Sequence, residues 1–399
     1  MSETKRKLGF INIAHFTDHY VLLIFPTVVI GMQAELNRSY AELIALSTAC
    51  FVAFGLFSLP AGWIGDHWSR RNMLAIFFFG CAGSLAAVAM APDLITLAIA
   101  LFVLGIFAAI YHPIGTTFLL SNSKNRGRDI ATNGVFGNLG VAFAPGITGV
   151  VASLFGWRMA FVIPAIVCAV MGVAFLLMTG EEKERPAERK RTAEARMTFA
   201  MAALFFGIYA LLSLSGGLVF NTVTISIPKI VDEGLRGNIP LAWIGSIATA
   251  VLLFGGIAQL TVGQLVQKIQ PHILFAIIGV MQGVGIALAS TMSGYGLLAA
   301  LALSIAAIYG QITVGDLVIA RYTADAWRGR VYAVRFFLAF ISSGLAVSMI
   351  AALYGRGGST LLLSVTTAFA IVFAICTLGI AILAARVERT NASSIQPAE

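Results

Sequence analysis

The chain alternates between long apolar runs and short polar or charged stretches. Twelve runs are about 20 residues long, enough to cross ~30 Å of hydrocarbon as a helix. Backbone polar groups in hydrocarbon must be bonded within their own segment, so each run is expected to be helical. The expected spans are 9–31, 43–64, 73–91, 95–120, 130–154, 158–180, 198–230, 242–266, 273–291, 294–318, 330–354 and 360–385. The seventh is long, and irregular or interfacial turns are expected in it near Pro228.

Composition identifies the solvent as lipid. Hydrophobic residues make up 59% of the chain and charged residues only 11%, against roughly 25% charged in soluble domains. A water-soluble fold of this composition would expose large adhesive patches. The net charge of +8 does not indicate a nucleic-acid partner, because the basic residues are scattered through the interhelical loops. Isolated cysteines inside apolar runs are interpreted as buried small hydrophobes: Cys50, Cys81, Cys168 and Cys376.

The basic residues are distributed very unequally between the two sides of the membrane. With both termini in the cytoplasm, all but five of the 26 Lys and Arg residues fall in inner segments; the five are Arg38, Arg158, Lys229, Arg236 and Arg356. This asymmetry follows the positive-inside rule. The basic, then apolar start lacks a small-residue cleavage site, so it is interpreted as a retained first helix. We expect a multi-pass protein of a bacterial-type inner membrane.

One polar interruption, residues 181–197, divides the chain into two six-helix halves, residues 1–180 and 198–399. The halves share matches at an offset of 202 residues. Residues 126–128 (RGR) recur as 328–330, Pro26 recurs as Pro228, and Gly156 recurs as Gly358. A fixed offset that joins equivalent topological points indicates duplication, as in many transporter folds.

The inner loop between spans two and three carries a recognisable motif. Gly62 is followed four residues later by Asp66, and Arg70 and Arg71 close the loop. This pattern resembles the cytoplasmic loop motif of the major facilitator superfamily, although Ser69 replaces the usual glycine. The resemblance implies a gate in which Asp66 caps a neighbouring helix end and pairs with an arginine. The alternative is a charged loop that only obeys topology.

Span five carries Gly140, Pro145 and Gly149, which resemble the helix motif of antiporters in the same superfamily. Small residues at this spacing allow a neighbouring helix to approach closely, and proline bends a helix. Residues 156–161 (GWRMAF) open span six as in many members. The resemblance covers the whole chain and implies an all-α integral membrane fold with twelve transmembrane helices in two six-helix pseudo-repeat halves. The antiporter motif favours export.

Span four departs from many drug:proton antiporters because residues 100–105 contain no arginine. It carries Tyr111 and His112 instead, and span one carries His15, Asp18 and His19. This combination resembles the fosmidomycin-resistance branch of exporters. The fold so implied places spans one and four along one central cavity. Titratable residues within a membrane are costly and mark functional sites. We predict Asp18 as proton acceptor with His15 or His112 as partner; the alternative is a polar cluster that only packs helices.

In the second half, Asp316 precedes Arg335 across the inner loop between spans ten and eleven. We predict an ion pair between them that acts as an inner gate, with direct substrate contact as the alternative. Further polar side chains within spans are candidates for the cavity: Asn138, Asn221 and Gln311. No metal site is assigned.

The leading hypothesis is a proton-coupled secondary exporter of a small amphiphilic or anionic molecule, in which the two halves rock around a midplane site. The first alternative is a proton symporter that takes up an organic acid or another nutrient. A second is metal efflux through the histidines; a membrane enzyme and a passive channel rank below it. No phosphate-binding GxxxxGK[ST] loop is present, so the expected energy source is the proton gradient, without a cofactor. A monomer is expected.

Overall fold

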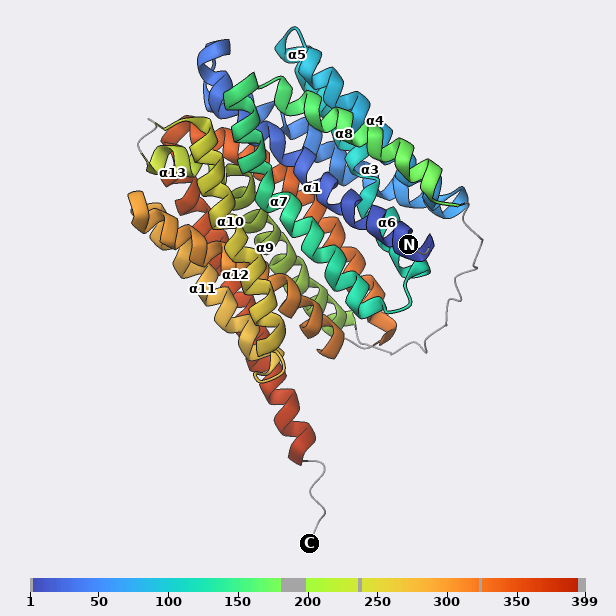
Figure 1. Ribbon diagram of the computed structural model, residues 1–399. Coiled ribbons are helices and arrows are strands. Elements are labelled where there is room, and N and C mark those ends of the chain that lie inside the picture. The colour runs from blue at the N-terminus through green and yellow to red at the C-terminus, as the bar shows by residue number, and fades with distance from the viewer. Residues whose placement is uncertain (1–2, 181–198, 236–238, 323–324, 394–399) are drawn as a thin grey trace. The chain divides into compact units, whose positions relative to one another are not determined.

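The computed structural model describes residues 3–180, 199–235, 239–322 and 325–393, and all regular secondary structure in them is α-helical (Figure 1). The predicted linker, 181–197, lies outside these residues. The helices are α1 (Glu3–Leu36), α2 (Tyr40–Ala45), α3 (Thr48–His67), α4 (Arg70–Met90), α5 (Leu94–Ala108), α6 (Tyr111–Asn122), α7 (Arg126–Phe155), α8 (Met159–Met178), α9 (Phe199–Gly234), α10 (Leu241–Leu265), α11 (Pro271–Thr291), α12 (Gly294–Tyr322) and α13 (Asp325–Ser393).

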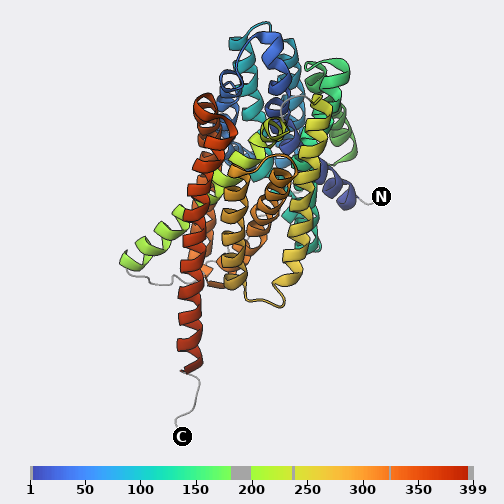
Figure 2. The same cartoon turned by 90° about the vertical axis from the view of Figure 1, so that its left-hand side faces the viewer.

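The described helices include eleven stretches that are long and apolar enough to cross a membrane. The last, Phe337–Ala385, has 49 residues, about twice the length that one crossing needs. Within it, Gly357 and Gly358 leave helical geometry, and Gly358 has a φ of 60°. α13 therefore consists of two consecutive helices, the second of which is the long red helix in Figure 2. The twelve predicted spans are confirmed.

Three spans differ in detail from the prediction. The second is divided into α2 and α3, and the fourth into α5 and α6. The prediction of irregular turns near Pro228 is wrong, because α9 is continuous from Phe199 to Gly234 with this proline inside it. Proline removes one backbone hydrogen bond, but within a membrane neighbouring groups can compensate and the helix need not end.

The repeat matches fall at equivalent structural points. Pro26 lies inside α1 and Pro228 inside α9, the first and seventh spans. Gly156, with a φ of 84°, ends α7, and Gly358, with a φ of 60°, separates the two parts of α13. A positive φ is a conformation that glycine adopts readily and other residues avoid. Both glycines therefore make the same sharp turn after the fifth span of their half.

The described residues form two compact units. Unit 1 contains those of Met1–Glu188, Asn221–Leu253 and Phe340–Ser359; unit 2 contains those of Arg189–Phe220, Phe254–Ala339 and Thr360–Glu399. Segments of the predicted second half thus pack within unit 1, and the division at 181–197 stays a prediction. In unit 1, α1 lies beside α7 and α4 beside α8 (Figure 1). In unit 2, α11 packs on α12.

The outer surfaces of several helices are apolar. Leu177 on α8 is 81% exposed, and Ile95 on α5 is 75% exposed. Such surfaces would associate in water but are at no disadvantage against lipid tails. The polar side chains are correspondingly turned inward, and they make up the candidate site.

Candidate functional site

The interruption of span four positions two of the candidate residues. α5 ends at Ala108, and α6 begins at Tyr111, directly followed by His112 and Pro113. Pro113 has no N–H to give to the carbonyl of Ala109, so one hydrogen bond of the helical ladder is missing at this point. Proline is tolerated in the first turn of a new helix, where an N–H has no helical partner in any case. Tyr111 and His112 therefore project from the first turn of α6.

Glycines bring α7 into direct contact with α1. A Cβ atom on Gly140 would lie 2.3 Å from the backbone oxygen of Phe16, and one on Gly137 would lie 2.5 Å from two atoms of the His15 ring. Any larger residue would force the two helices apart. The absence of side chains on one face of α7 is thus what fixes the depth and orientation of His15.

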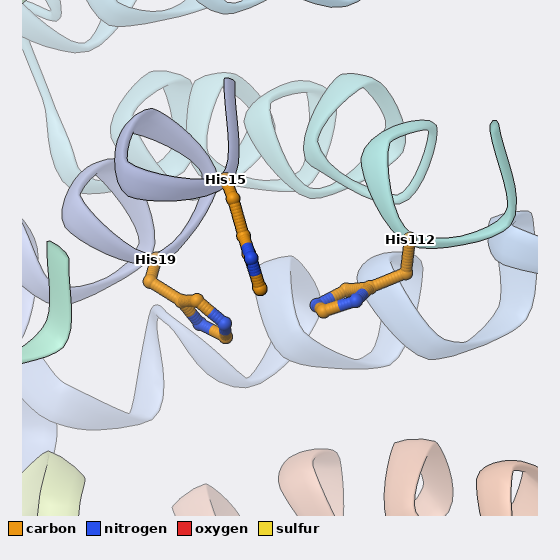
Figure 3. Close-up of side chains that lie close together, drawn as sticks. All are labelled: His15, His19 and His112. Carbon is orange, nitrogen blue, oxygen red and sulfur yellow. The ribbon is translucent and has the colours of Figure 1, made fainter. Parts of the chain in front are cut away.

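Three imidazoles converge in unit 1, His15 and His19 from α1 and His112 from α6 (Figure 3). The ring centroids lie 5.0 Å apart for His15 and His19, 5.5 Å for His15 and His112, and 5.4 Å for His19 and His112. One nitrogen of each ring lies within 4.8 Å of the others, a spacing that could hold a metal ion. The same donors can bind an anion or exchange protons.

Asp18 lies beside this cluster and is completely buried, with 0% of its surface exposed. His112 Nε2 lies 3.3 Å from Asp18 Oδ2, which is within ion-pair distance. Neither carboxylate oxygen accepts a hydrogen bond of good geometry from the described residues. A buried carboxylate is costly unless it is paired or protonated. The charge state of Asp18 is therefore coupled to the position and charge of the neighbouring imidazole.

Asn133 on α7 joins the cluster, although the sequence did not single it out. Its carbonyl oxygen lies 2.8 Å from His15 Nδ1, and its side-chain oxygen accepts a 3.0 Å hydrogen bond from the Tyr111 hydroxyl. Its amide donates to the side chain of Asn12 at 3.0 Å. The signal was available, because Asn133, Gly137 and Gly140 follow each other at helical spacing. Asn133 holds the His15 and Tyr111 rings, which stack 4.8 Å apart.

The remaining predicted cavity residues do not all join this cluster. Asn138 is half-buried on α7, and Asn221 on α9 donates to the Ser342 hydroxyl at 3.2 Å in unit 1. Gln311 belongs to unit 2, where it is buried near Gly216, whose Cβ position lies 3.6 Å from its side-chain oxygen. The cluster in unit 1 thus gathers five predicted residues: His15, Asp18, His19, Tyr111 and His112.

Unit 2 contains the predicted pair of Asp316 and Arg335. Arg335 Nη1 donates to Asp316 Oδ1 between α12 and α13. The side chains are 22% and 49% exposed for Arg335 and Asp316, respectively. The pair is therefore partly hydrated, and arginine keeps its charge at any accessible pH. Its contact is observed, and its role as a gate stays a prediction.

The loop between α3 and α4 divides its predicted roles among different residues. Asp66 accepts from Arg70 at 3.0 Å, so the carboxylate pairs with an arginine of its own loop. Arg71, rather than Asp66, caps a helix: it donates to the carbonyls of Leu176 and Thr179 at the end of α8, at 2.7 and 2.9 Å. A cation at this end complements the helix dipole.

The glycine that opens the loop motif has a packing role. Gly62 faces α6, where its Cβ position lies 3.2 Å from Pro113, beside the break that carries His112. A side chain at this position would press on the start of α6. The loop motif and the histidine cluster are therefore connected through the contact between Gly62 and Pro113.

The antiporter-like residues on α7 form a second close helix contact in unit 1. A Cβ on Gly149 would lie 2.6 Å from the Leu241 oxygen on α10, and one on Gly245 of α10 would lie 2.1 Å from the Pro145 oxygen. Gly146 N–H donates to Thr249 Oγ1 at 3.0 Å. One glycine-rich helix therefore packs against α1 through Gly140 and against α10 through Pro145 and Gly149.

Comparison with known structures supports the fold over nearly the full length of the chain. A bacterial homolog of the human lysosomal transporter Spinster, in an inward-facing and occupied conformation, superposes with a TM-score of 0.77 at 14% identity, covering 95% of this chain and 96% of that one. A D-xylose-proton symporter gives 0.76 at 14% identity, with 94% and 97% covered. At this identity the similarity concerns the fold alone.

Sequence comparison finds relatives over shorter segments. An uncharacterized MFS-type transporter of Bacillus subtilis is 23% identical over 46% of this chain and 47% of its own length. A probable L-galactonate transporter of Escherichia coli is 25% identical over 41% and 39%, and a cis,cis-muconate transport protein of Acinetobacter baylyi is 26% identical over 39% and 38%. The chain thus matches less than half the length of these relatives. Residues 8–243 match the Major Facilitator Superfamily as a whole. The chain therefore belongs to the major facilitator superfamily.

Proposed function

We propose that the chain is a proton-coupled secondary transporter of a small organic anion. The observation that carries the proposal is the buried Asp18 carboxylate beside His112, with two further imidazoles next to it. Two similar proteins are named for organic acids, galactonate and muconate. A site with three imidazoles and one carboxylate has more potential cations than anions, which suits an anionic substrate.

The proposed coupling follows from competition for His112. While Asp18 is ionised, its carboxylate holds the His112 ring, whose Nε2 lies 3.3 Å away. When Asp18 takes up a proton, this imidazole becomes available to a substrate carboxylate, and His15 and His19 can add N–H donors. Proton and anion then bind together, because each removes a charge that the other would leave unpaired. Joint binding is symport, and an inward proton gradient makes it uptake.

Export by antiport is the second candidate, and the packing of α7 favours it. Gly140, Pro145 and Gly149 match the antiporter-like motif, and all three lie at close helix contacts. The resemblance of spans one and four to the fosmidomycin-resistance branch points in the same direction. In antiport the proton and the substrate compete for the site instead of binding together.

The membrane orientation and the gate are proposed from charge. The positive-inside pattern places both termini in the cytoplasm of a bacterial-type cell. Asp316 and Arg335 lie near the cytoplasmic ends of their spans in that orientation, so we assign their ion pair to the inner gate. The proton gradient is the proposed energy source.

The sign of a pH change distinguishes the two couplings. We would reconstitute the protein in liposomes with a pH dye inside, without a gradient, and add galactonate or muconate outside. Symport acidifies the interior, whereas antiport makes it more alkaline. A secondary transporter is reversible, so the sign does not depend on how the protein is inserted.

The expected result is acidification with wild type and none with Asp18→Asn. Glu35→Gln is the matched control, because Glu35 lies at the far end of α1, 52% exposed and bonded to Arg158. Uptake of the labelled acids without any pH change would refute proton coupling. If the protein transports cobalt(II) or neutral xylose but neither acid, the proposal of an anionic substrate is refuted. Transport of cobalt(II) would favour the alternative of metal efflux.

A further inference from the structure

A second buried group of charges lies at the end of α9, in the part of that helix that belongs to unit 1. Lys229 Nζ lies 2.7 Å from Asp232 Oδ2 and 3.8 Å from Glu233 Oε1. The side chains of Lys229 and Asp232 are only 11% and 10% exposed. All three residues lie within one helical turn, so the lysine is neutralised by carboxylates of its own helix.

Tyr40, the first residue of α2, links this charged turn to another part of the chain. Lys229 Nζ lies 5.8 Å from the centroid of the Tyr40 ring, within range of a cation–π interaction. The ring also contacts Tyr354 of α13, with centroids 4.8 Å apart. Tyr40 is buried, and its hydroxyl has no hydrogen-bond partner among the described residues. Its ring therefore carries the contact.

Glu233 holds the third segment in place. Its Oε2 accepts a 3.2 Å hydrogen bond from the backbone N–H of Ser359, just after the sharp turn at Gly358. This N–H belongs to the start of the second helix of α13, where a carboxylate is favourable. Glu233 thus joins α9 to the turn that directly follows Tyr354.

The backbones around this group are in close contact as well. A Cβ on Gly355 would lie 3.4 Å from Ala41 Cβ, next to Tyr40. At the same end of unit 1, the amide of Ala242 donates to Ser153 Oγ at 2.9 Å. Parts of α9, α10 and α13 thus pack directly on helices of the first six spans.

We propose that Tyr40, Lys229, Asp232, Glu233 and Tyr354 form a latch that holds this end of the protein closed and opens during transport. Alternating access requires that each end separate in turn. Opening here breaks a cation–π contact, a ring contact and the hydrogen bond from Ala242 to Ser153, while Asp232 and Glu233 move with Lys229 on α9. No buried charge loses its partner, so the latch can open without a large penalty. The charge pattern predicts this end to be extracytoplasmic.

The latch is tested by the accessibility of a cysteine placed beside it. Ala41→Cys, at a half-buried position next to Tyr40, is reacted with a bulky maleimide in purified protein, and protein without the added cysteine gives the background, since the four native cysteines are buried. Tyr40→Leu removes the ring and is expected to raise the labelling rate about threefold or more. Tyr40→Phe keeps the ring and is expected to match Tyr40 itself.

Glu35→Gln is the matched control for charge. Glu35 lies near this end, but it bonds Trp157 and Arg158 within the first six spans at 3.0 and 3.3 Å, so its loss should leave labelling unchanged. Equal labelling in Tyr40→Leu and Tyr40→Phe would overturn the proposal. If Tyr40→Leu fails to fold, Tyr354→Leu replaces it, because it removes the same ring contact from the other partner and is expected to raise labelling in the same direction.

A disulfide provides an independent measurement. Ala41→Cys with Gly355→Cys places two Cβ atoms close enough for a bond. Oxidation should stop transport of whichever probe the protein carries, and reduction should restore it; continued transport after complete cross-linking would overturn the latch. The labelling experiment needs no substrate. It therefore tests the latch even if the protein proves not to couple protons to an organic anion.

Discussion

The histidine cluster of unit 1 and the ion pair of unit 2 differ in the kind of charge they hold. Unit 1 places a fully buried Asp18 beside imidazoles, and all of these groups can gain or lose a proton. Unit 2 pairs Asp316, 49% exposed, with Arg335, whose charge is permanent. Imidazoles and a buried carboxylate can exchange protons during transport, whereas the arginine of the ion pair cannot. Under the proposed function, coupling would therefore belong to unit 1, and a gate or an anion contact to unit 2.

The strongest test of this division removes His112. In His112→Gln, Asp18 loses the imidazole 3.3 Å away and stays protonated or pays for an unpaired buried charge. We expect proton-driven accumulation of substrate to fall about tenfold or more. His67→Gln is the control, since His67 is exposed at the end of α3 and stacks on Trp63. Equal accumulation in the two variants would contradict the assignment of coupling to unit 1.

A smaller effect is expected in unit 2. An ion pair at this exposure contributes about 1 kcal/mol or less, so Arg335→Gln should slow transport roughly fivefold at most if the pair acts only as a gate. The number of protons moved per substrate should not change. Asp316→Asn added to Arg335→Gln should recover part of the rate, because it removes the carboxylate left without its arginine. A changed proton ratio would move coupling into unit 2.

The spans could be predicted from sequence because the bilayer imposes both length and helical geometry on every apolar run. The interruption between α5 and α6 was not predicted, although Pro113 carries the signal for it. Pro228 carries the same signal without ending α9. A proline therefore marks a possible break, and the surrounding packing decides whether the helix continues.

The candidate site was only partly predictable for a related reason. His15, Asp18 and His112 stand out because titratable groups within spans are rare. Asn133 does not, since a neutral amide near the start of a span costs little there. Its importance comes from the register of α7 against α1, which Gly137 and Gly140 determine through close contact. Such a register depends on three-dimensional packing and cannot be derived from one helix alone.

Helix packing gives a third test, on stability. In unit 1 a Cβ on Gly140 meets the backbone oxygen of Phe16 at 2.3 Å, whereas in unit 2 one on Gly279 meets the Thr377 hydroxyl at 2.4 Å. Backbone cannot rotate away, so Gly140→Ala should cost about 1–3 kcal/mol and Gly279→Ala less. Gly134→Ala, on α7 with nothing within 4 Å, should be nearly neutral. Thermal unfolding in detergent measures the loss of stability in each variant. Equal losses in all three variants would contradict the expected order.

The smallest expected difference concerns the helices that begin span four and span ten. In unit 1 the Asp93 carboxylate caps α5, and hydrogen bonds from Thr96 and Ile95 lower the pKa of Asp93 below its usual 3.8. α12 in unit 2 begins instead at Gly294, with a φ of 58° and no acidic residue in its first turn.

Because the pKa of Asp93 is lowered in the folded protein, its carboxylate stabilises the fold at neutral pH. This contribution is lost as the pH falls through the lowered pKa, below about 4. Asn caps helices as well as Asp does but carries no charge. Asp93→Asn should therefore lower the midpoint of thermal unfolding slightly at pH 7, and the difference from wild type should disappear at the lowest pH at which both unfold reversibly. If the difference from wild type persists at that pH, Asp93 stabilises α5 through the geometry of its cap and not through its charge. The starts of α5 and α12 would then differ in cap geometry but not in a stabilising charge.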